Sequence, residues 1–412
     1  MSSDWKTEYD LLAGKLAARG VDVEKVKARL KSQQIETPSW GYADSGTRFG
    51  PYKQAGSAVT IEEKIADAAQ VHKYTGIAPG VAVHVLWDFP NGLADADSLA
   101  SYAKSLGVAI GAINPNVFQD REYAFGSITN EDPKVREMAV AHMIDCVEIG
   151  KKLGSKTLSL WFADGTDYPG QGDFRRRKKY AEESLKKVYA AIPKDMRMLI
   201  EYKPFEPAFY HTDFGDWGMS YSFANKCGPN AHVLVDLGHH FTGQNIEHLV
   251  SFLIDEERLG GFHFNNHRYA DDDLTAGSVN PYELFLIYNE IVKAEDAPNG
   301  NPPIAYMVDQ AFVTKSKIDA MIQTIMNIQR AYAKSMCVDR AKLYKSQLAD
   351  DIVTAEDCLQ DAFNTDVEPL LRVVREEMGL DPDPLAAFRA SGYWAKVSKE
   401  RGVRAGSGGI GA

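Results

Sequence analysis

The sequence predicts a (β/α)8 TIM barrel, an α/β fold, with an N-terminal helix and a C-terminal helical extension. Two observations support this prediction. Eight short apolar, β-branched segments alternate with helix-like segments, and from about Thr314 onward only helix-like segments remain. Alternating strands and helices are typical of a parallel sheet with helical crossovers, and eight strands is the number that closes into this barrel.

The elements follow in order along the chain. Residues 1–33 are predicted to be a helical segment, because Tyr9, Leu12 and Leu16 share one apolar stripe. Residues 34–313 are predicted to hold the barrel, and residues 314–412 the helical extension with a flexible tail. The predicted strands are Gln34–Thr37, Val81–Leu86, Ala109–Asn114, Thr157–Phe162, Met198–Lys203, Val233–Asp236, Gly261–Asn265 and Pro303–Asp309.

Helix boundaries between the strands carry recognisable signals. Asp132 is expected to cap a helix whose first position is Pro133. Asn245 is expected to cap a second helix, with Gly260-Gly261 ending the connection that follows it. In the extension, further helices are expected at Ala355–Met378 and Pro384–Ser391.

Two alternative architectures compete with this prediction. A doubly wound open sheet normally carries a G-x-G-x-x-G turn after its first strand, and the nearest candidate, GYADSG at residues 41–46, does not fit that pattern. For the extension, the alternative is a separate helical domain instead of a segment that packs on the barrel or on a neighbouring subunit.

Composition limits the partners and the compartment. A formal net charge of −11 argues against a nucleic-acid or anionic-membrane partner. The dense basic run RRRKK at residues 175–179 is interpreted as the solvated face of a helix. The four cysteines show no CxxC pair, and the chain has no apolar run of about 18 residues and no signal-peptide pattern, so a reducing cytoplasm is expected.

Polar side chains gather where the predicted strands end. Catalytic groups of a parallel barrel come from the carboxyl ends of its strands, so residues from consecutive ends should converge. The residues at or just beyond these ends are His84, Trp87, Asp88, Asn114, Trp161, Asp164, Glu201, Lys203, Asp236, His239, His240, His263, Asp271, Asp273 and Asp309. A lone acid or histidine of this kind is usually structural, but a set of them at one barrel mouth indicates a site.

The acids and histidines in this set predict a metal centre. Several carboxylates with imidazoles and no cysteine form an oxygen and nitrogen ligand set that suits Mn²⁺, Mg²⁺, Co²⁺ or Zn²⁺ in Lewis-acid work. There are enough ligands for two ions. One ion would be held by Glu201, Asp236, His263 and Asp309, and the other by His239, Asp271 and Asp273, with Glu201 able to bridge.

Aromatic residues are expected in the same pocket. Trp40, Trp87, Trp161 and Phe49 fall near the same barrel mouth. Tryptophan faces beside polar groups pack well against the C–H faces of sugars, although aromatic linings are common in pockets of many kinds.

Specific motifs are spread over most of the chain. They are IETPSWGYADSGTRF, VAVHVLWD, GAINPNVFQD, LWFADGTDYPGQ, EYKPFEPAFY, VDLGHH, GFHFNNHRYADDDL, MVDQ and MGLDPDPLAAFRASGYW. Together they resemble the L-rhamnose isomerases of the broad-specificity bacterial type, in the xylose-isomerase-like superfamily.

The resemblance implies roles for individual residues. Glu201, Asp236, His263 and Asp309 would hold a structural ion, and Glu201, His239, Asp271 and Asp273 a catalytic one, most simply two Mn²⁺ per subunit. Lys203 would contact substrate, His84 would act at the reactive end of the sugar, and Trp161 would form an aromatic wall. Phe49 would reach the site of a neighbouring subunit, which implies a homotetramer. Trp40, Trp87, His239 and Asp271 complete the expected sugar contacts.

The implied activity is interconversion of L-rhamnose and L-rhamnulose, with D-allose and L-mannose as further substrates. Hydrogen would pass between C1 and C2 as hydride or through an enediol, and Asp309 is a candidate base for the second route. A ketose 3-epimerase on the same barrel is the main alternative. A metal-dependent phosphodiesterase or endonuclease conflicts with the acidic charge, and a non-catalytic sugar-binding protein conflicts with the costly cluster of ligands.

Overall fold

The computed structural model describes residues 5–47, 50–205, 210–297 and 303–404, and its centre is a closed parallel barrel. Around the barrel the strands run β1-β12-β11-β10-β8-β6-β5-β4. Their bounds are β1 Glu36–Pro38, β4 Gly80–His84, β5 Ala109–Asn114, β6 Thr157–Leu160, β8 Arg197–Glu201, β10 Ala231–Asp236, β11 Leu259–Phe264 and β12 Ala305–Val308. The predicted barrel is therefore confirmed, with each strand close to its expected place.

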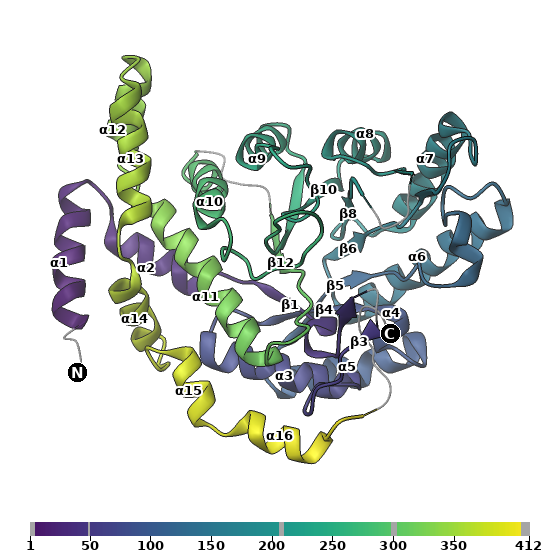
Figure 1. Cartoon of the computed structure of the whole chain (residues 1–412), viewed down its shortest axis with the longest axis horizontal. Helices are drawn as coiled ribbons and strands as arrows, with labels where there is room; N and C mark the ends of the chain where they lie inside the picture. Colours follow the sequence, from purple (N-terminus) through teal and green to yellow (C-terminus); the bar gives the residue numbers. More distant parts are fainter. Residues whose placement is uncertain (1–4, 48–49, 206–209, 298–302, 405–412) are drawn as a thin grey trace.

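A ring of helices surrounds the strands (Figure 1). These helices are α3 Ile61–Thr75, α5 Ala96–Ser105, α6 Pro133–Leu153, α7 Phe174–Ala191, α8 Trp217–Cys227, α9 Ile246–Asp255, α10 Pro281–Glu295 and α11 Lys317–Met336. The expected caps are present: the side chain of Asp132 accepts from Lys134 N at the start of α6, and that of Asn245 from His248 N at the start of α9. Each cap satisfies a backbone N–H that the helix itself leaves without a partner.

Helices at both ends of the chain lie outside this ring. They are α1 Trp5–Ala18, α2 Val23–Ser32, α12 Arg340–Leu348, α13 Ile352–Asn364, α14 Glu368–Glu377, α15 Pro384–Ala390 and α16 Tyr393–Arg401. In Figure 1, α12 and α13 project from the body while α14 to α16 run along its edge. Tyr393 Oη and Arg401 Nη1 contact the buried carboxylate of Asp67 in α3 at 2.8 and 2.7 Å, which ties α16 to a barrel helix.

Some local expectations were wrong. Val85 and Leu86, expected in a strand, belong to the short helix α4 (Val85–Asp88). Gly260, expected to lie in a connection before the strand, lies inside β11, which begins two residues earlier than predicted. A Cβ on Gly260 would lie 2.3 Å from Leu199 Cδ2, so glycine is needed there for close strand packing and not for a turn. Small features without periodicity were missed: η1 Ser39–Tyr42, η2 Gly92–Asp95, η3 Arg121–Phe125, and the strand pairs β2 Gly46–Thr47 with β3 Gly50–Pro51 and β7 Gly165–Thr166 with β9 His211–Thr212.

The basic run at the start of α7 is only partly a solvated face. Arg177 is 2% exposed, and its guanidinium meets the carboxylate of Asp213 at 2.8 Å and the hydroxyl of Thr129 at 2.7 Å. A buried arginine is tolerable because the paired carboxylate and the hydrogen bonds replace its hydration. The neighbouring Arg176 and Lys178 remain on the surface.

Small and medium apolar side chains fill the barrel below its mouth. Ala82, Ala112, Leu199, Leu234 and Met307 are buried together there, with the ring of Trp40 above them. This floor separates the polar mouth from the opposite end of the barrel. No helix among the described residues is long and apolar enough to cross a membrane, and the four cysteines form no disulfide.

Candidate metal centre and active site

A cavity of about 330 Å³ opens at the carboxyl ends of the barrel strands. It is lined by Trp40, His84, Trp87, Asn114, Pro115, Phe118, Gln119, Ser159, Trp161, Glu201, Lys203, His239, His263, Asp271, Asp273 and Asp309. Most of the strand-end residues that the sequence predicted therefore meet in one cavity. Asp88, Asp164 and His240 do not line it, because their side chains are turned to Ser39 and Lys64, to Ser127 and Thr129, and to Tyr202, respectively. Asp236 is not on this wall but contacts the residues that are, and Phe49 lies outside the described residues.

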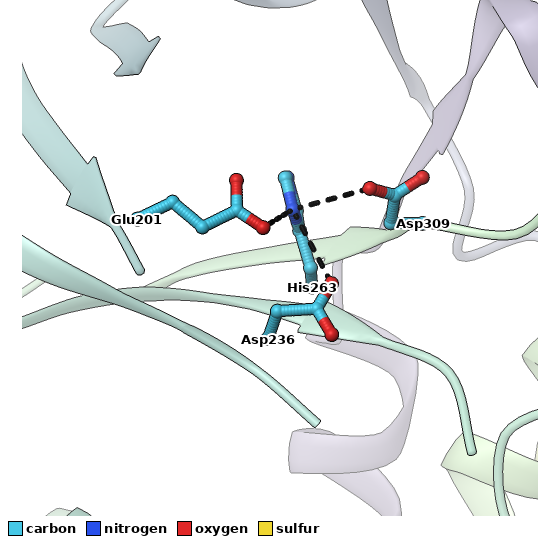
Figure 2. Close-up of side chains that lie close together, drawn as sticks. All are labelled: Glu201, Asp236, His263 and Asp309. Atoms are coloured by element: carbon cyan, nitrogen blue, oxygen red, sulfur yellow. Dashed lines mark hydrogen bonds and ion pairs between the residues drawn. The ribbon is translucent and has the colours of Figure 1, made fainter. Parts of the chain in front are cut away.

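Four side chains from four neighbouring strands converge at one side of the cavity (Figure 2). The Nδ1 atom of His263 lies 3.2 Å from Glu201 Oε1, 3.7 Å from Asp236 Oδ2 and 3.5 Å from Asp309 Oδ2. One potential ligand atom from each residue lies within 4.8 Å of every other. This is the first ligand set that the sequence predicted, now brought together by the strand order of the barrel.

A second set adjoins the first. Ligand atoms of Asp236, His239 and Asp271 also lie within 4.8 Å of one another. His239 Nδ1 is 3.1 Å from Glu201 Oε1, and His239 Nε2 is 3.2 Å from Asp271 Oδ1. Glu201 thus touches both clusters, as a bridging ligand would, while Asp236 takes a place in the second set that the sequence had not assigned to it.

Asp273 lines the cavity but belongs to neither compact set. Its backbone has φ of +45°, a left-handed conformation that aspartate tolerates better than most residues but that still costs free energy. The neighbouring Asp272 turns its carboxylate to the backbone N–H groups of Arg268 and Tyr269, at 2.6 and 2.9 Å. The turn therefore directs Asp271 and Asp273 toward the cavity while Asp272 holds the turn itself.

The spacing of these atoms fits bound cations. Ligand atoms held about 2.1 Å from one ion lie roughly 3.0 to 3.5 Å from each other, and the N···O distances in both sets fall close to that range. Nδ1 of His239 and Oδ1 of Asp271 are buried and have no hydrogen bond of good geometry among the described residues. Since buried polar atoms are rarely left without hydrogen bonds, both atoms are available to coordinate a cation. The residues present therefore fit divalent metal ions.

Mutual electrostatics hold the cluster together. Burial would raise the pKa of Glu201, but His263 and His239 outweigh it and lower that pKa to about 2. Burial would likewise lower the pKa of His263, yet the Glu201 carboxylate raises it to about 9. Burial raises the pKa of Asp236 to about 7. So many acids near one another favour a state in which cations, either protons or metal ions, compensate their charge.

An aromatic wall faces the carboxylate cluster. The ring centroid of His84 lies 4.8 Å from that of Trp40 and 4.2 Å from that of Trp87, and Phe118 lies 4.8 Å from Trp161. The indole N–H of Trp40 donates to Asp309 Oδ1 at 2.9 Å, which joins the wall to the cluster. One side of the cavity is thus apolar and the other strongly polar, as expected for a pocket that holds a polyhydroxylated molecule with C–H faces.

Lys203 lines the cavity and contacts residues of both sides. Its Nζ lies 2.7 Å from Asp271 Oδ2 and 5.1 Å from the centre of the Trp161 ring. Its backbone is held in place, because Lys203 N donates to Phe214 O at 2.8 Å and Lys203 O accepts from Thr212 Oγ1 at 2.7 Å. The ion pair with Asp271 places the ammonium group beside the second ligand set.

His84 is positioned through its backbone. The buried carboxylate of Asp88 accepts from His84 N at 3.0 Å and from Ser39 Oγ at 2.5 Å, and pairs with Lys64 Nζ at 2.7 Å. Asp88 therefore fixes the backbone of His84, and these contacts occupy both carboxylate oxygens of Asp88. Burial, reinforced by Lys64, lowers the pKa of His84 to about 3, so the imidazole is neutral at physiological pH.

Several residues that line the cavity were not predicted from the sequence. Phe118 and Gln119 lie in the loop after β5, where no periodicity marks them, and Gln119 Oε1 accepts from Trp87 Nε1 at 2.7 Å. Ser159 lies on β6, two residues before Trp161 and so on the same strand face. The period-two pattern could have predicted Ser159 at the cavity, because it stands two residues before a tryptophan at the strand end.

Comparisons with known proteins agree with this architecture. The family model of the xylose isomerase-like TIM barrel matches residues 66–286. A probable sugar isomerase of Rhizobium meliloti is 43% identical over 98% of this chain and 94% of its own length. A probable sugar isomerase of Mesorhizobium japonicum is 42% identical over 99% of this chain and 95% of its own length.

Among solved structures, a D-psicose 3-epimerase crystallised in the presence of D-fructose superposes with a TM-score of 0.51. The superposition covers 73% of this chain and 97% of the epimerase, at 14% sequence identity. That similarity concerns the fold alone. The family match and the two full-length relatives establish the classification: the chain belongs to the xylose isomerase-like TIM barrel family.

Proposed function

We propose that this protein is a divalent-metal-dependent aldose–ketose isomerase that interconverts L-rhamnose and L-rhamnulose and also accepts aldoses such as D-allose and L-mannose. The observation that carries the proposal is the pair of adjoining ligand sets that share Glu201 and face an aromatic wall across one cavity. The full-length similarity to two proteins named probable sugar isomerases supports the class of reaction.

The chain's own residues account for binding. Trp40, Trp87 and Trp161 offer flat faces to the C–H groups of a sugar, and Lys203 offers a charged donor to its hydroxyl groups. His239 and Asp271 stand where the sugar would meet the second ligand set. Phe49 of a neighbouring subunit would complete the wall in a homotetramer.

The same residues account for hydrogen transfer between C1 and C2. Two bound divalent ions, in our proposal Mn²⁺, would polarise the carbonyl as Lewis acids. Asp309 lines the cavity with a carboxylate whose pKa is raised by burial, so it can accept a proton in an enediol route. The aromatic wall limits water beside the reacting carbons, which a hydride route also needs. Deuterium from D₂O in the product at C1 or C2 would exclude a pure hydride shift.

Location in the cytoplasm is part of the proposal. The cysteines are unpaired, and Cys146, Cys337 and Cys358 are buried. Unpaired thiols are typical of proteins from a reducing compartment.

The test is a panel of sugars assayed with the Mn²⁺-loaded protein. L-Rhamnose, L-mannose, L-lyxose, D-allose and D-ribose would be supplied separately, and the products identified by ¹³C NMR. We expect the ketose formed by exchange between C1 and C2, fastest from L-rhamnose. A parallel sample of the ketose D-fructose tests the 3-epimerase alternative. Its conversion to the C3 epimer, with none of the five aldoses consumed, would refute the proposal.

A further inference from the structure

One buried arginine joins several loops at the mouth of the barrel. Arg177 lies near the start of α7 and is 2% exposed. Each of its three guanidinium nitrogens donates to an oxygen atom of another segment. Nε donates to Asp213 Oδ2 at 3.1 Å, Nη1 to Phe125 O at 3.1 Å, and Nη2 to Gly165 O at 2.8 Å and Thr129 Oγ1 at 2.7 Å. A planar group whose donors point in fixed directions can hold several segments in one arrangement.

The partners of Arg177 lie in three loops that follow adjacent strands of the barrel. Phe125 and Thr129 follow β5, Gly165 follows β6, and Asp213 follows β8. None of these partners belongs to either ligand set. The same loops carry one part of the cavity lining, which includes Phe118, Gln119, Trp161 and Lys203. Arg177 therefore ties together the loops that form this part of the lining.

The contacts of Arg177 reach Lys203 through the segment that flanks it. Asp213, which pairs with the guanidinium group at 2.8 Å, lies between Thr212 and Phe214. Thr212 Oγ1 donates to Lys203 O at 2.7 Å, and Lys203 N donates to Phe214 O at 2.8 Å. The backbone N–H and C=O of Lys203 are therefore both held by the neighbours of the residue that Arg177 binds.

Asp164 makes a second link among the same three loops. Its carboxylate, in the loop after β6, accepts from Ser127 N at 2.8 Å and from Ser127 Oγ at 2.7 Å, and its backbone O accepts from Asp213 N at 2.9 Å. The adjoining Gly126 has φ of +101°, and a Cβ on it would lie 2.9 Å from Arg177 Nη2. The junction of the loops is thus packed closely around the guanidinium group, which leaves little room for another arrangement.

The first ligand set is held in a different way. Glu201, Asp236 and His263 belong to β8, β10 and β11, and Asp309 directly follows β12. Hydrogen bonds of the barrel sheet fix the backbones of these strands. A disturbance of the junction at Arg177 should therefore displace the loops and leave these ligands in place.

From this geometry we infer that Arg177 is a positioning residue, which sets Trp161 and Lys203 at the distance from the ligand sets that a bound sugar requires. The inference rests on the proposed isomerase function, since that function assigns both residues to the substrate. The role is distinct from neutralising Asp213. A lysine at position 177 would keep the positive charge, but its donors share one nitrogen and do not match acceptors arranged around a planar fork.

Arg177→Lys tests the positioning role, and Arg176→Lys is its matched control. Arg176 is the exposed neighbour in the same helix, and its guanidinium group pairs with Glu131 at 3.2 Å. With L-rhamnose as substrate, the KM of Arg177→Lys should rise about tenfold while kcat stays within about threefold, because sugar binding is weakened and the metal chemistry is not. Its affinity for Mn²⁺, measured by calorimetry, should equal that of the wild type. Arg176→Lys should equal the wild type in all three measurements.

Two results in folded Arg177→Lys would overturn the inference. An unchanged KM would show that only the charge is needed. A parallel loss of Mn²⁺ affinity and of sugar binding would show that Arg177 supports the whole mouth of the barrel. If Arg177→Lys does not fold, Arg177→Met combined with Asp213→Asn removes both buried charges, so that neither is left without a partner. That double variant should show the same rise in KM, and an unchanged KM would again refute the role.

Hydrogen exchange gives a readout that needs no sugar. Amides of the three loops, in residues 115–132, 161–173 and 210–216, should exchange faster in Arg177→Lys than in the wild type, while those of β10 and β11 should not change. Equal exchange rates in these loops would refute the junction that Arg177 makes. Failure of the wild type to convert any of the five aldoses, with the exchange difference present, would instead refute the isomerase proposal.

Discussion

The indole N–H of Trp40 donates to Oδ1 of Asp309 at 2.9 Å, so the aromatic wall and the ligand cluster are mechanically joined. Trp40 is 3% exposed, and its ring rests on the apolar floor of the barrel. Trp40 follows β1, the strand that pairs with β12 to close the barrel. A residue beyond the first strand therefore orients the Asp309 carboxylate at the end of the last one.

Trp40→Phe tests this connection. It keeps most of the aromatic surface but removes the donor, so Asp309 loses a hydrogen bond that orients it. We expect the affinity for Mn²⁺ to fall at least about tenfold, as is typical when a partner of a metal ligand is removed. Trp87→Phe is the matched control, since its N–H binds Gln119 and not a ligand. Calorimetry should show weaker Mn²⁺ binding only for Trp40→Phe, and equal affinities in both variants would disprove the coupling.

The three adjacent aspartates provide an internal comparison. Asp271→Asn and Asp273→Asn should abolish turnover, because each removes a charge that faces the cavity. Asp272→Asn should be mild, since its side chain bonds only backbone N–H groups of the turn and the amide oxygen can still accept. Asparagine tolerates the positive φ of residue 273, so the backbone is not the cause of the loss. Equal loss of kcat in all three variants would contradict the assignment of two ions to this site.

Lys203 allows binding of metal and binding of sugar to be separated. Lys203→Met removes a positive charge 2.7 Å from Asp271 Oδ2 while keeping the length of the side chain. The second ligand set becomes more negative, so its affinity for Mn²⁺ should stay equal or increase. The kcat/KM should nevertheless fall about 100-fold, because a charged contact to substrate is lost. A parallel fall of metal affinity and activity would show instead that Lys203 supports the ligands.

His232 predicts a dependence of stability on pH. Burial, with Arg197 and Arg258 nearby, lowers its pKa from 6.5 to about 4 in the folded state. Between those values His232 binds a proton in the unfolded chain but not in the folded chain. The folded state therefore loses stability relative to the unfolded state as the pH falls from 6.5 to about 4. The slope is about 1.4 kcal/mol per pH unit for one proton. Guanidinium unfolding of wild type and His232→Gln should show a shallower slope in the variant, and identical slopes would contradict the assignment.

How far the sequence predicted the site depended on where each residue lies. Glu201, Asp236, His263 and Asp309 sit at strand ends, so the period-two pattern and the barrel topology placed them together. Phe118 and Gln119 lie in an irregular loop, and no periodic pattern relates such a loop to the cavity that it covers.

Two further gaps have physical causes. The burial of Arg177 depends on Asp213, a distant partner that charge patterning along one helix cannot show. Gly260 was expected to end a connection, but the requirement for glycine comes from Leu199 on a strand remote in sequence. Both features arise from long-range packing, which overrides a local signal.

The central claim, that this barrel isomerises an aldose with bound divalent metal, is tested most directly by measuring L-rhamnose conversion by one protein sample in three states. The sample would be assayed as prepared, after EDTA treatment and dialysis with metal content measured, and after addition of Mn²⁺. We predict that L-rhamnulose formation disappears with the metal and returns on adding Mn²⁺. Undiminished conversion by protein shown to be free of metal would contradict the account.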